Sequence, residues 1–232
     1  EINPNFLSAF QKTQNYLQEA KVMVEDASIM IYQQVAQEIG DEIHYDLKQL
    51  TRLSNYKSYL YQWLRDFGFT AWDDIYDLVE AQTGKMVYAN EFRLIKNRDF
   101  LILSSIKIVE NQEYFINERE KDVNIPLNIT FTLVDDYFIT ENTTIFADRD
   151  KLKFPLTLRR WQQGDAFEPL GMKGQTKKLS KFFKDEKLSI LEKENTWLLC
   201  SENQIVWIVG IRQDERFKIE NSTINKLKIS IS

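Results

Sequence analysis

The sequence is poor in the residues that crosslink small domains or bind metals. Among its 232 residues, Cys200 is the single cysteine and His44 the single histidine. One cysteine excludes an internal disulfide, and the two residues together cannot supply the four ligands of a Cys/His zinc site. Metal chemistry by this chain is therefore not expected.

Long apolar runs and phosphate-binding glycine motifs are also missing. No apolar run approaches the ~20 residues of a membrane span, and the first residues have neither a basic start nor a small-residue cleavage site. The seven glycines form neither a GxGxxG motif nor a P-loop. We expect a cytoplasmic protein without a membrane partner, and no nucleotide binding by this chain.

What the sequence has is core material and an uneven distribution of charge. Hydrophobic residues make up 43% and aromatic residues 13%, enough for folded domains. The net charge is -5, yet residues 1–150 carry 14 Lys and Arg against 25 Asp and Glu, whereas residues 151–218 carry 14 against 9. This asymmetry predicts an acidic scaffold attached to a basic surface that attracts phosphates.

Residues 1–40 have the pattern of one long helix. Asn3 can cap it, Pro4 suits its first position, and neither Gly nor Pro recurs before Gly40. An apolar stripe at steps of three and four follows its length: Phe6, Phe10, Leu17, Ala20, Val24, Ala27, Ile31 and Val35. A core stripe within this chain is the favoured interpretation, and a face that packs on a further domain is the alternative.

Two shorter helices and then strands follow. Apolar spacing predicts one helix that ends at Gly68 and another that runs from Thr70 to near Gly84. The pattern then changes to alternation, which predicts a hairpin of residues 91–95 and 100–103 around a turn at 97–99. Further strands are expected at residues 106–109, 125–134, 137–139 and 143–146.

These elements predict an α+β chain in two parts. Residues 1–104 form a helical module that ends in a β-hairpin. Residues 105–232 form a mainly β domain with a short basic amphipathic helix. The strands of this second domain include the apolar runs TWLLC and IVWIV.

Residues 154–189 hold three glycines, two prolines and eight Lys or Arg residues. Arg159 and Arg160 end a predicted strand beside Trp161, and a guanidinium next to an aromatic ring offers both a phosphate contact and a stacking surface. The alternative is that Trp161 is a core anchor and the arginines are only exposed. The glycines at 171 and 174 predict tight turns around Lys173.

Residues 176–185 predict a short amphipathic helix. Leu179, Phe182 and Phe183 face inward, and four lysines face outward: Lys177, Lys178, Lys181 and Lys184. Lys177 and Lys178 in the first turn, next to its exposed amides, predict an anion site. A lysine-rich face that only aids solubility is the alternative. Farther on, Asp214 stands between Arg212 and Arg216, where it is expected to brace them.

Asp135, Asp136 and His44 are not expected to be catalytic. Asp135 and Asp136 lie between predicted strands, where a solvated turn is the favoured interpretation. A hydrolase built on that pair or on His44 would lack a nucleophile with a partner.

The segments LRRWQQGDAFEPLGMKGQTKKLSKFFKD and IVWIVGIRQDERFK resemble the C-terminal domain of the tRNA(Ile)-lysidine synthase family. The resemblance covers residues 148–218, and INPNF and GFTAWDDIYDLV resemble that family's middle domain more loosely. The family usually reads KKLSDFF, whereas Lys181 here stands at the acidic position and raises the positive charge.

The resemblance implies part of an ATP-dependent ligase that joins lysine to the wobble cytidine of the CAU anticodon. In the family, ATP and Mg belong to an N-terminal PP-loop domain with an SGGxDS motif, and this chain has no Gly-Gly pair. We therefore expect no cofactor, no catalytic residue and no activity in this chain alone. The implied partners are tRNA(Ile), the protein's own catalytic domain and a possible homodimer.

The residues expected to contact RNA share a positive charge or a stacking ring late in the chain. They are Arg159, Arg160, Trp161, Lys173, Lys177, Lys178, Lys181, Lys184, Arg212 and Arg216. Phosphate contacts of this kind fix the register of an RNA without reading its sequence. The rival hypothesis is a scaffold or dimerisation module that braces the catalytic domain.

Overall fold

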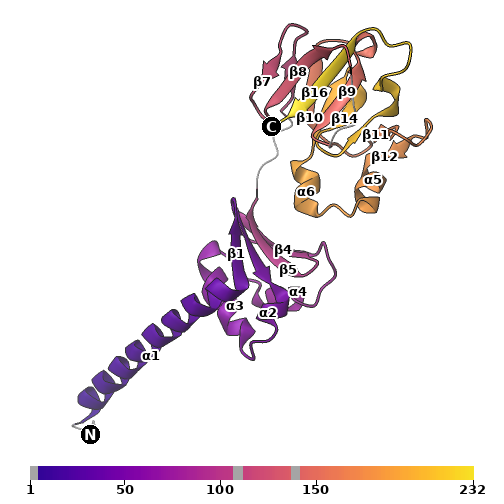
Figure 1. Cartoon of the computed structure of the whole chain (residues 1–232). Helices are drawn as coiled ribbons and strands as arrows, with labels where there is room; N and C mark the ends of the chain where they lie inside the picture. Colours follow the sequence, from indigo (N-terminus) through magenta and orange to yellow (C-terminus); the bar gives the residue numbers. More distant parts are fainter. Residues whose placement is uncertain (1–4, 107–111, 137–141) are drawn as a thin grey trace. The chain divides into compact units, whose positions relative to one another are not determined.

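The computed structural model describes residues 5–106, 112–136 and 142–232, and it confirms the α+β class. Contacts divide the chain into two compact units, Glu1–Ile108 and Val109–Ser232 (Figure 1). The sequence placed the boundary between residues 104 and 105. No helix among the described residues is long and apolar enough to cross a membrane.

The first unit begins with the long helix α1, Phe6–Val35. Asn3 and Pro4 lie outside the described residues. The helix ends five residues before the predicted stop, because Ala36 takes an extended conformation and opens strand β1, Ala36–Ile39. Gly40 instead occupies the turn into the antiparallel strand β2, Glu42–Asp46, where its φ of 58° suits glycine.

The stripe along α1 is covered only at its last turns. Ser28 and Val35 are buried, and the indole Nε1 of Trp63 donates to the Ser28 hydroxyl at 2.9 Å. Toward the start of the helix, Phe6 is 55% exposed and Leu17 is 66% exposed. Figure 1 shows these turns extending away from the rest of the unit. The prediction of a core stripe is therefore wrong for most of the helix.

The rest of unit 1 is a five-stranded antiparallel sheet in the order β1-β2-β5-β4-β3, packed against short helices. Their bounds are α2 Leu47–Leu50, α3 Tyr56–Leu64, α4 Trp72–Leu78, β3 Met86–Tyr88, β4 Phe92–Asn97 and β5 Phe100–Ser105. The hairpin β4–β5 confirms the prediction. The "helical module" holds three strands more than that hairpin, and α4 ends six residues before Gly84.

One face of this sheet forms the core of unit 1. Leu94 pairs with Leu103 and Tyr45 pairs with Leu101, so these side chains point to the same face. They pack against buried leucines of the helices, including Leu60 of α3. The helices cover this face of the sheet because the apolar residues of both pack together in one core layer.

Unit 2 is mainly β, as predicted. Its strands are β6 Tyr114–Ile116, β7 Asp122–Val123, β8 Ile129–Val134, β9 Thr144–Asp148, β10 Leu156–Arg160, β11 Ala166–Phe167, β12 Lys177–Lys178, β13 Trp197–Ser201, β14 Gln204–Ile208, β15 Arg212–Gln213 and β16 Lys226–Ile231. They form sheets in the orders β15-β14-β13-β10-β6 and β7-β8-β16-β9 and the two-stranded β11-β12. Its helices are α5 Leu179–Asp185 and α6 Ile190–Asn195.

The five-stranded sheet of unit 2 is buried on both faces. Leu199 and Val206 pack toward the four-stranded sheet, whereas Leu198 and Ile205 pack toward α5. A strand covered on both sides needs apolar residues at every position, which explains the unbroken runs in β13 and β14.

The other predicted strands have mixed outcomes. The strand expected at 125–134 is shorter and begins at Ile129, which follows Pro126. Proline lacks the N–H that a central strand uses. The strand at 143–146 is confirmed as β9. Positions 107–109 and 137–139 lie outside the described residues.

Candidate nucleic-acid interface

A small hairpin followed by a helix carries most of the predicted lysine contacts. β11 pairs with β12, so Ala166 faces Lys178 and Phe167 faces Lys177. α5 follows directly, and its Leu179, Phe182 and Phe183 are buried, as predicted. Phe182 packs edge-on against Phe167 with ring centroids 5.0 Å apart. We call residues 166–185 the basic module.

The prediction that Lys177 and Lys178 occupy the first helical turn is wrong. Both lie in β12, and Lys178 is the residue that precedes α5. Ladder hydrogen bonds to β11 hold these residues extended. The helix has only seven residues, so an anion site at its N-terminus has no support from the structure.

The lysines of the basic module differ in their availability to a ligand. Lys178, Lys181 and Lys184 are exposed, and none of their ammonium groups makes a hydrogen bond or ion pair within the described part of the chain. Lys177 is different: its Nζ lies 2.8 Å from Asp185 Oδ2 and 5.3 Å from the centre of the Phe182 ring. This ion pair lowers the pKa of Asp185.

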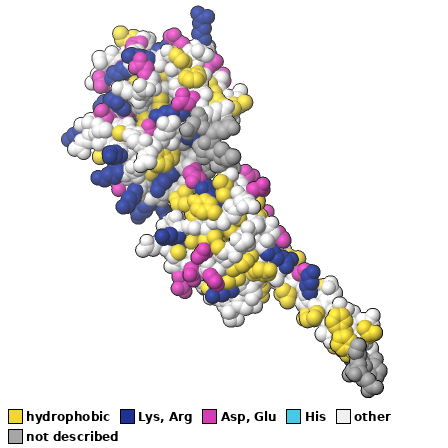
Figure 2. Space-filling model, turned by 180° about the vertical axis from the view of Figure 1, so that it is seen from behind, with side chains coloured by type: hydrophobic (Ala, Val, Ile, Leu, Met, Phe, Trp, Pro, Cys, Tyr) yellow, Lys and Arg dark blue, Asp and Glu magenta, His cyan; other side chains and the backbone are white. Residues whose placement is uncertain are grey.

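The exposed lysines gather on one side of unit 2. Figure 2 shows dark-blue side chains close together at the lower left of the upper body, over α5 and the hairpin before it. Lys181 and Lys184 are three residues apart in α5, a spacing that keeps both on one face of the helix, and Lys178 directly precedes the helix. The charges of Lys181 and Lys184 help to lower the pKa of Asp185, but the lysines still outnumber that carboxylate, and an excess of like charge attracts anions from solution.

Arg159 is held inside the protein. Its guanidinium makes two hydrogen bonds to Asp165, Nη1 to Oδ2 at 2.9 Å and Nη2 to Oδ1 at 2.8 Å. These bonds raise the pKa of Arg159. The side chains are only 15% and 13% exposed. Arg159 therefore braces the strand end instead of presenting its charge to a ligand.

Arg160 and Trp161 also make internal contacts. The Arg160 guanidinium lies 3.9 Å from the centre of the Trp197 ring, and burial lowers its pKa. Trp161 is partly buried and packs edge-on against Phe183, with centroids 5.4 Å apart. The alternative of a core anchor thus describes Trp161 better than an open stacking surface.

Arg212 and Arg216 differ in whether their side chains are available to a ligand. Arg212 is exposed and has no ion pair among the described residues. Arg216 donates from Nε and Nη2 to Asp214 at 2.9 and 2.7 Å. The predicted brace is therefore present for Arg216 and absent for Arg212.

Lys173 stands at an exposed turn between β11 and β12. Gly171 and Gly174 have φ of 90° and 77°, and Lys173 itself has φ of 51°. Lysine rarely takes this left-handed conformation. The turn confirms the predicted role of the glycines and leaves the Lys173 ammonium without an ion pair in the described structure.

The hydrolase alternative gains no support. His44 Nε2 lies 2.8 Å from Glu42 and stacks edge-on against Phe100. No group of three or more His, Cys, Asp or Glu residues in the described ranges could hold a metal ion. Asp135 contributes its main-chain oxygen to Lys226.

Asp165 organises this site, although the sequence indicated only a turn at Gly164-Asp165 and not a site residue. Besides Arg159, its side chain accepts from the Gln162 N–H at 2.7 Å, and its main-chain oxygen accepts from the Leu179 N–H at 2.8 Å. Asp165 thereby joins β10 to the start of α5. The turn-forming Gly164-Asp165 pair was the available signal, because aspartate commonly fixes such turns.

Comparisons with known proteins match both units. A family model for the TilS substrate binding domain matches residues 37–106, and a model for the TilS substrate C-terminal domain matches residues 156–229. The second match includes the whole basic module. The two domain models therefore fall on separate units of the chain.

Curated relatives match nearly the whole chain. The tRNA(Ile)-lysidine synthase of Parabacteroides distasonis is 38% identical over 96% of this chain and 51% of its own length. The enzyme of that name from Bacteroides thetaiotaomicron is 30% identical over 96% of this chain and 50% of its own. The chain thus spans about half the length of these curated relatives.

A crystal structure of a TilS C-terminal domain overlaps 52% of this chain and 97% of its own, with 21% identity and a TM-score of 0.44, too low to carry an argument by itself. The two domain models and the curated relatives agree on one family. The chain belongs to the tRNA(Ile)-lysidine synthase family, whose substrate-binding and C-terminal domains it carries.

Proposed function

We propose that this chain is the tRNA-binding portion of a tRNA(Ile)-lysidine synthase. The observation that carries the proposal is the set of exposed lysines at 173, 178, 181 and 184, which have no ion pair within the described residues of an otherwise acidic protein. Such a surface suits a ribose-phosphate backbone. The relatives that cover this chain bear the name of a tRNA-modifying enzyme.

In this proposal the chain positions tRNA and does not catalyse. The whole protein would join lysine to the wobble cytidine of tRNA(Ile) with a CAU anticodon, in the cytoplasm. ATP and Mg would bind a PP-loop domain outside these residues, and no Gly-Gly pair of that domain's motif occurs here. Backbone contacts do not read sequence, so selectivity would come from RNA shape and from that domain.

The proposed contacts are narrower than the set expected from sequence. Lys173, Lys178, Lys181, Lys184 and Arg212 remain as proposed phosphate contacts. Arg159, Arg216 and Lys177 serve as internal ion-pair partners, and Arg160 and Trp161 as packing residues.

A filter-binding titration of this chain with tRNA(Ile) at several salt concentrations tests the proposal. We expect binding that weakens as salt rises, with a slope of about 0.7–0.9 in log K per log salt for each phosphate contact. A matched DNA hairpin and a heteropolymeric RNA serve as competitors. Absence of binding at low salt, with both units folded by circular dichroism, would refute tRNA binding by this portion.

One observation favours a second function, bracing of the catalytic domain or dimerisation. The apolar stripe of α1 is uncovered over its first turns, with Phe6 at 55% and Leu17 at 66% exposure. Exposed apolar patches of this kind mark contact surfaces. Self-association by sedimentation that is insensitive to salt, without tRNA binding, would support this function over the first.

A further inference from the structure

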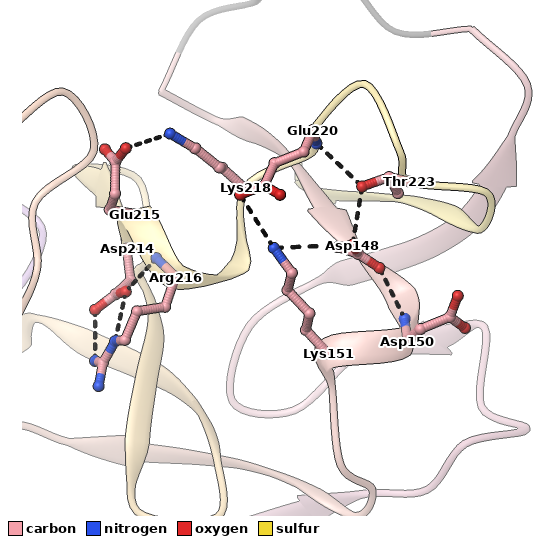
Figure 3. A network of polar contacts seen from close by, with 9 residues as sticks. All are labelled: Asp148, Asp150, Lys151, Asp214, Glu215, Arg216, Lys218, Glu220 and Thr223. Carbon is pink, nitrogen blue, oxygen red and sulfur yellow. Dashed lines mark hydrogen bonds and ion pairs between the residues drawn. The ribbon is translucent and has the colours of Figure 1, made fainter. Parts of the chain in front are cut away.

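Asp214 is a buried carboxylate at the centre of a polar network. It is 0% exposed, and it accepts two hydrogen bonds from the Arg216 side chain at 2.9 and 2.7 Å. The main-chain N–H groups of Arg216 and Glu168 also donate to it, both at 2.9 Å. Figure 3 shows the Arg216 guanidinium turned back onto this carboxylate. A buried charge is tolerated because every direction of approach is filled by a donor.

Glu168 begins the loop that carries Lys173. Hydrogen bonds join the start of this loop to residues 213–215, the segment that contains Asp214. The Glu215 N–H donates to the Glu168 carbonyl at 2.7 Å, and the Leu170 N–H donates to the Gln213 carbonyl at 3.0 Å. One side-chain contact adds to these bonds, because the Gly171 N–H donates to Glu215 Oε2 at 2.6 Å. We call these hydrogen bonds between residues 168–171 and 213–215 the clamp. Residues 168–171 are thus fixed against residues 213–215.

Beyond the clamp the chain turns immediately. The Met172 N–H donates to the Pro169 carbonyl at 3.0 Å, and the Gln175 N–H donates to the Met172 carbonyl at 3.1 Å. Lys173 at the tip is therefore held between the clamp on one side and β12 on the other. Its left-handed φ of 51° persists only while the surrounding contacts determine the path of the loop.

We propose that Asp214 is a positioning residue for RNA binding, which fixes the loop of residues 168–174 and thereby presents Lys173 to a phosphate. The proposal rests on the proposed tRNA-binding function. It assigns Arg216 a role as the partner that neutralises Asp214 and not as a contact to RNA. A loop that is already ordered loses less entropy when the ligand binds, so the lysine contact is stronger.

The test is a double-mutant cycle in the whole chain. Asp214→Asn, Lys173→Ala and the double variant are titrated with tRNA(Ile) by filter binding across salt. We expect each single variant to bind about five- to tenfold more weakly, the size of one solvent-exposed hydrogen bond. The double variant should be no weaker than either single variant, because both changes remove the same contact.

Asp148→Asn is the matched control. Asp148 is also a buried carboxylate of this network, 8% exposed, and it accepts from the Asp150 N–H and the Thr223 hydroxyl, away from the loop. It should lower stability and leave RNA affinity unchanged. Equal losses of affinity in Asp148→Asn and Asp214→Asn, or fully additive losses in the cycle, would overturn the proposal.

Hydrogen exchange separates this inference from the proposed function. In Asp214→Asn the amides of Glu168, Leu170 and Gly171 should exchange at least tenfold faster than in the parent, with β10 and β13 unchanged. Unchanged exchange in that loop would refute the positioning role even if the chain binds tRNA. If Asp214→Asn does not fold, Glu215→Ala is used instead: it frees the Gly171 N–H and also the Lys218 ammonium, and Lys218→Ala is its control. Glu215→Ala, but not Lys218→Ala, must show the same exchange and the same cycle with Lys173→Ala.

Discussion

The guanidinium of Arg159 and the carboxylate of Asp165 meet side by side through two hydrogen bonds of 2.9 and 2.8 Å. This geometry belongs to arginine, because a lysine ammonium cannot make both bonds at once. The pair lies at the end of β10, where the chain enters the basic module. The pair therefore fixes the path of the chain at this point.

Asp165→Asn should destabilise unit 2. An amide can accept only one of the two bonds, and the half-buried Arg159 charge keeps no full counter-charge, at a cost of about 1–3 kcal/mol. Hydrogen exchange of β10 and β13 peptides in urea measures the free energy of opening. The control is Asp122→Asn, an exposed carboxylate, which should shift it by less than about 0.5 kcal/mol. Equal effects of the two variants would show that the pair contributes nothing.

Lys181→Ala combined with Lys184→Ala should weaken tRNA binding. Two phosphate contacts are lost, so the salt slope should fall by about 1.4–1.8. The charge-matched control is Lys121→Ala with Lys153→Ala, since both of these lysines are exposed outside the basic module. An equal loss of affinity in the control would mean that overall charge alone governs binding.

Stability should fall at high pH through Cys200. Burial raises the pKa of its thiol from 9.0 to about 11. Because the folded pKa lies above the unfolded one, the stabilisation is complete below about pH 9 and is lost as pH rises toward 11. The free energy of unfolding, measured from pH 8 to 10.5, should decline less in Cys200→Val than in the parent, and this difference isolates the thiol from the tyrosines. Identical slopes would contradict the prediction.

The two ends of α1 should respond differently to substitution. Leu17→Gln should change the free energy of unfolding by less than about 0.5 kcal/mol, because Leu17 is 66% exposed. Ser28→Ala should cost about 0.5–1.5 kcal/mol, since the Trp63 indole loses its 2.9 Å partner and keeps only the Ser28 main-chain oxygen at 3.3 Å. Hydrogen exchange of α3 peptides in urea gives both values. A large loss in Leu17→Gln would indicate that the stripe is covered in solution.

Sequence patterns correctly predicted the elements whose structure depends on neighbouring residues. The β4–β5 hairpin, the inward residues of α5 and the apolar strands β13 and β14 follow from spacing and turn residues. The strands β1 and β2 were missed, because Ala36 to Ile39 continue the helical spacing of α1. The extended form of β2 depends on pairing with β5, which lies about 60 residues later, and β1 in turn pairs with β2.

The candidate site divides for a similar reason. The exposure of Lys181 and Lys184 could be identified from sequence, because it follows from helical spacing; Lys178 is exposed as predicted but lies in β12. The internal use of Arg159 and Lys177 could not, since Asp165 and Asp185 become partners only after the hairpin and α5 fold. Ion pairs between such residues depend on tertiary geometry that spacing does not encode.

The position of β16 sets an order for folding during synthesis. Lys226–Ile231 lies between β8 and β9, and it is made after both of the strands it joins. The sheet of unit 1, in contrast, is complete once Ser105 has been made. On the ribosome, the sheet of unit 1 can therefore form before β16 is available to pair with β8 and β9. During that interval β8 and β9 each have an edge without its native partner, and such edges favour misassembly.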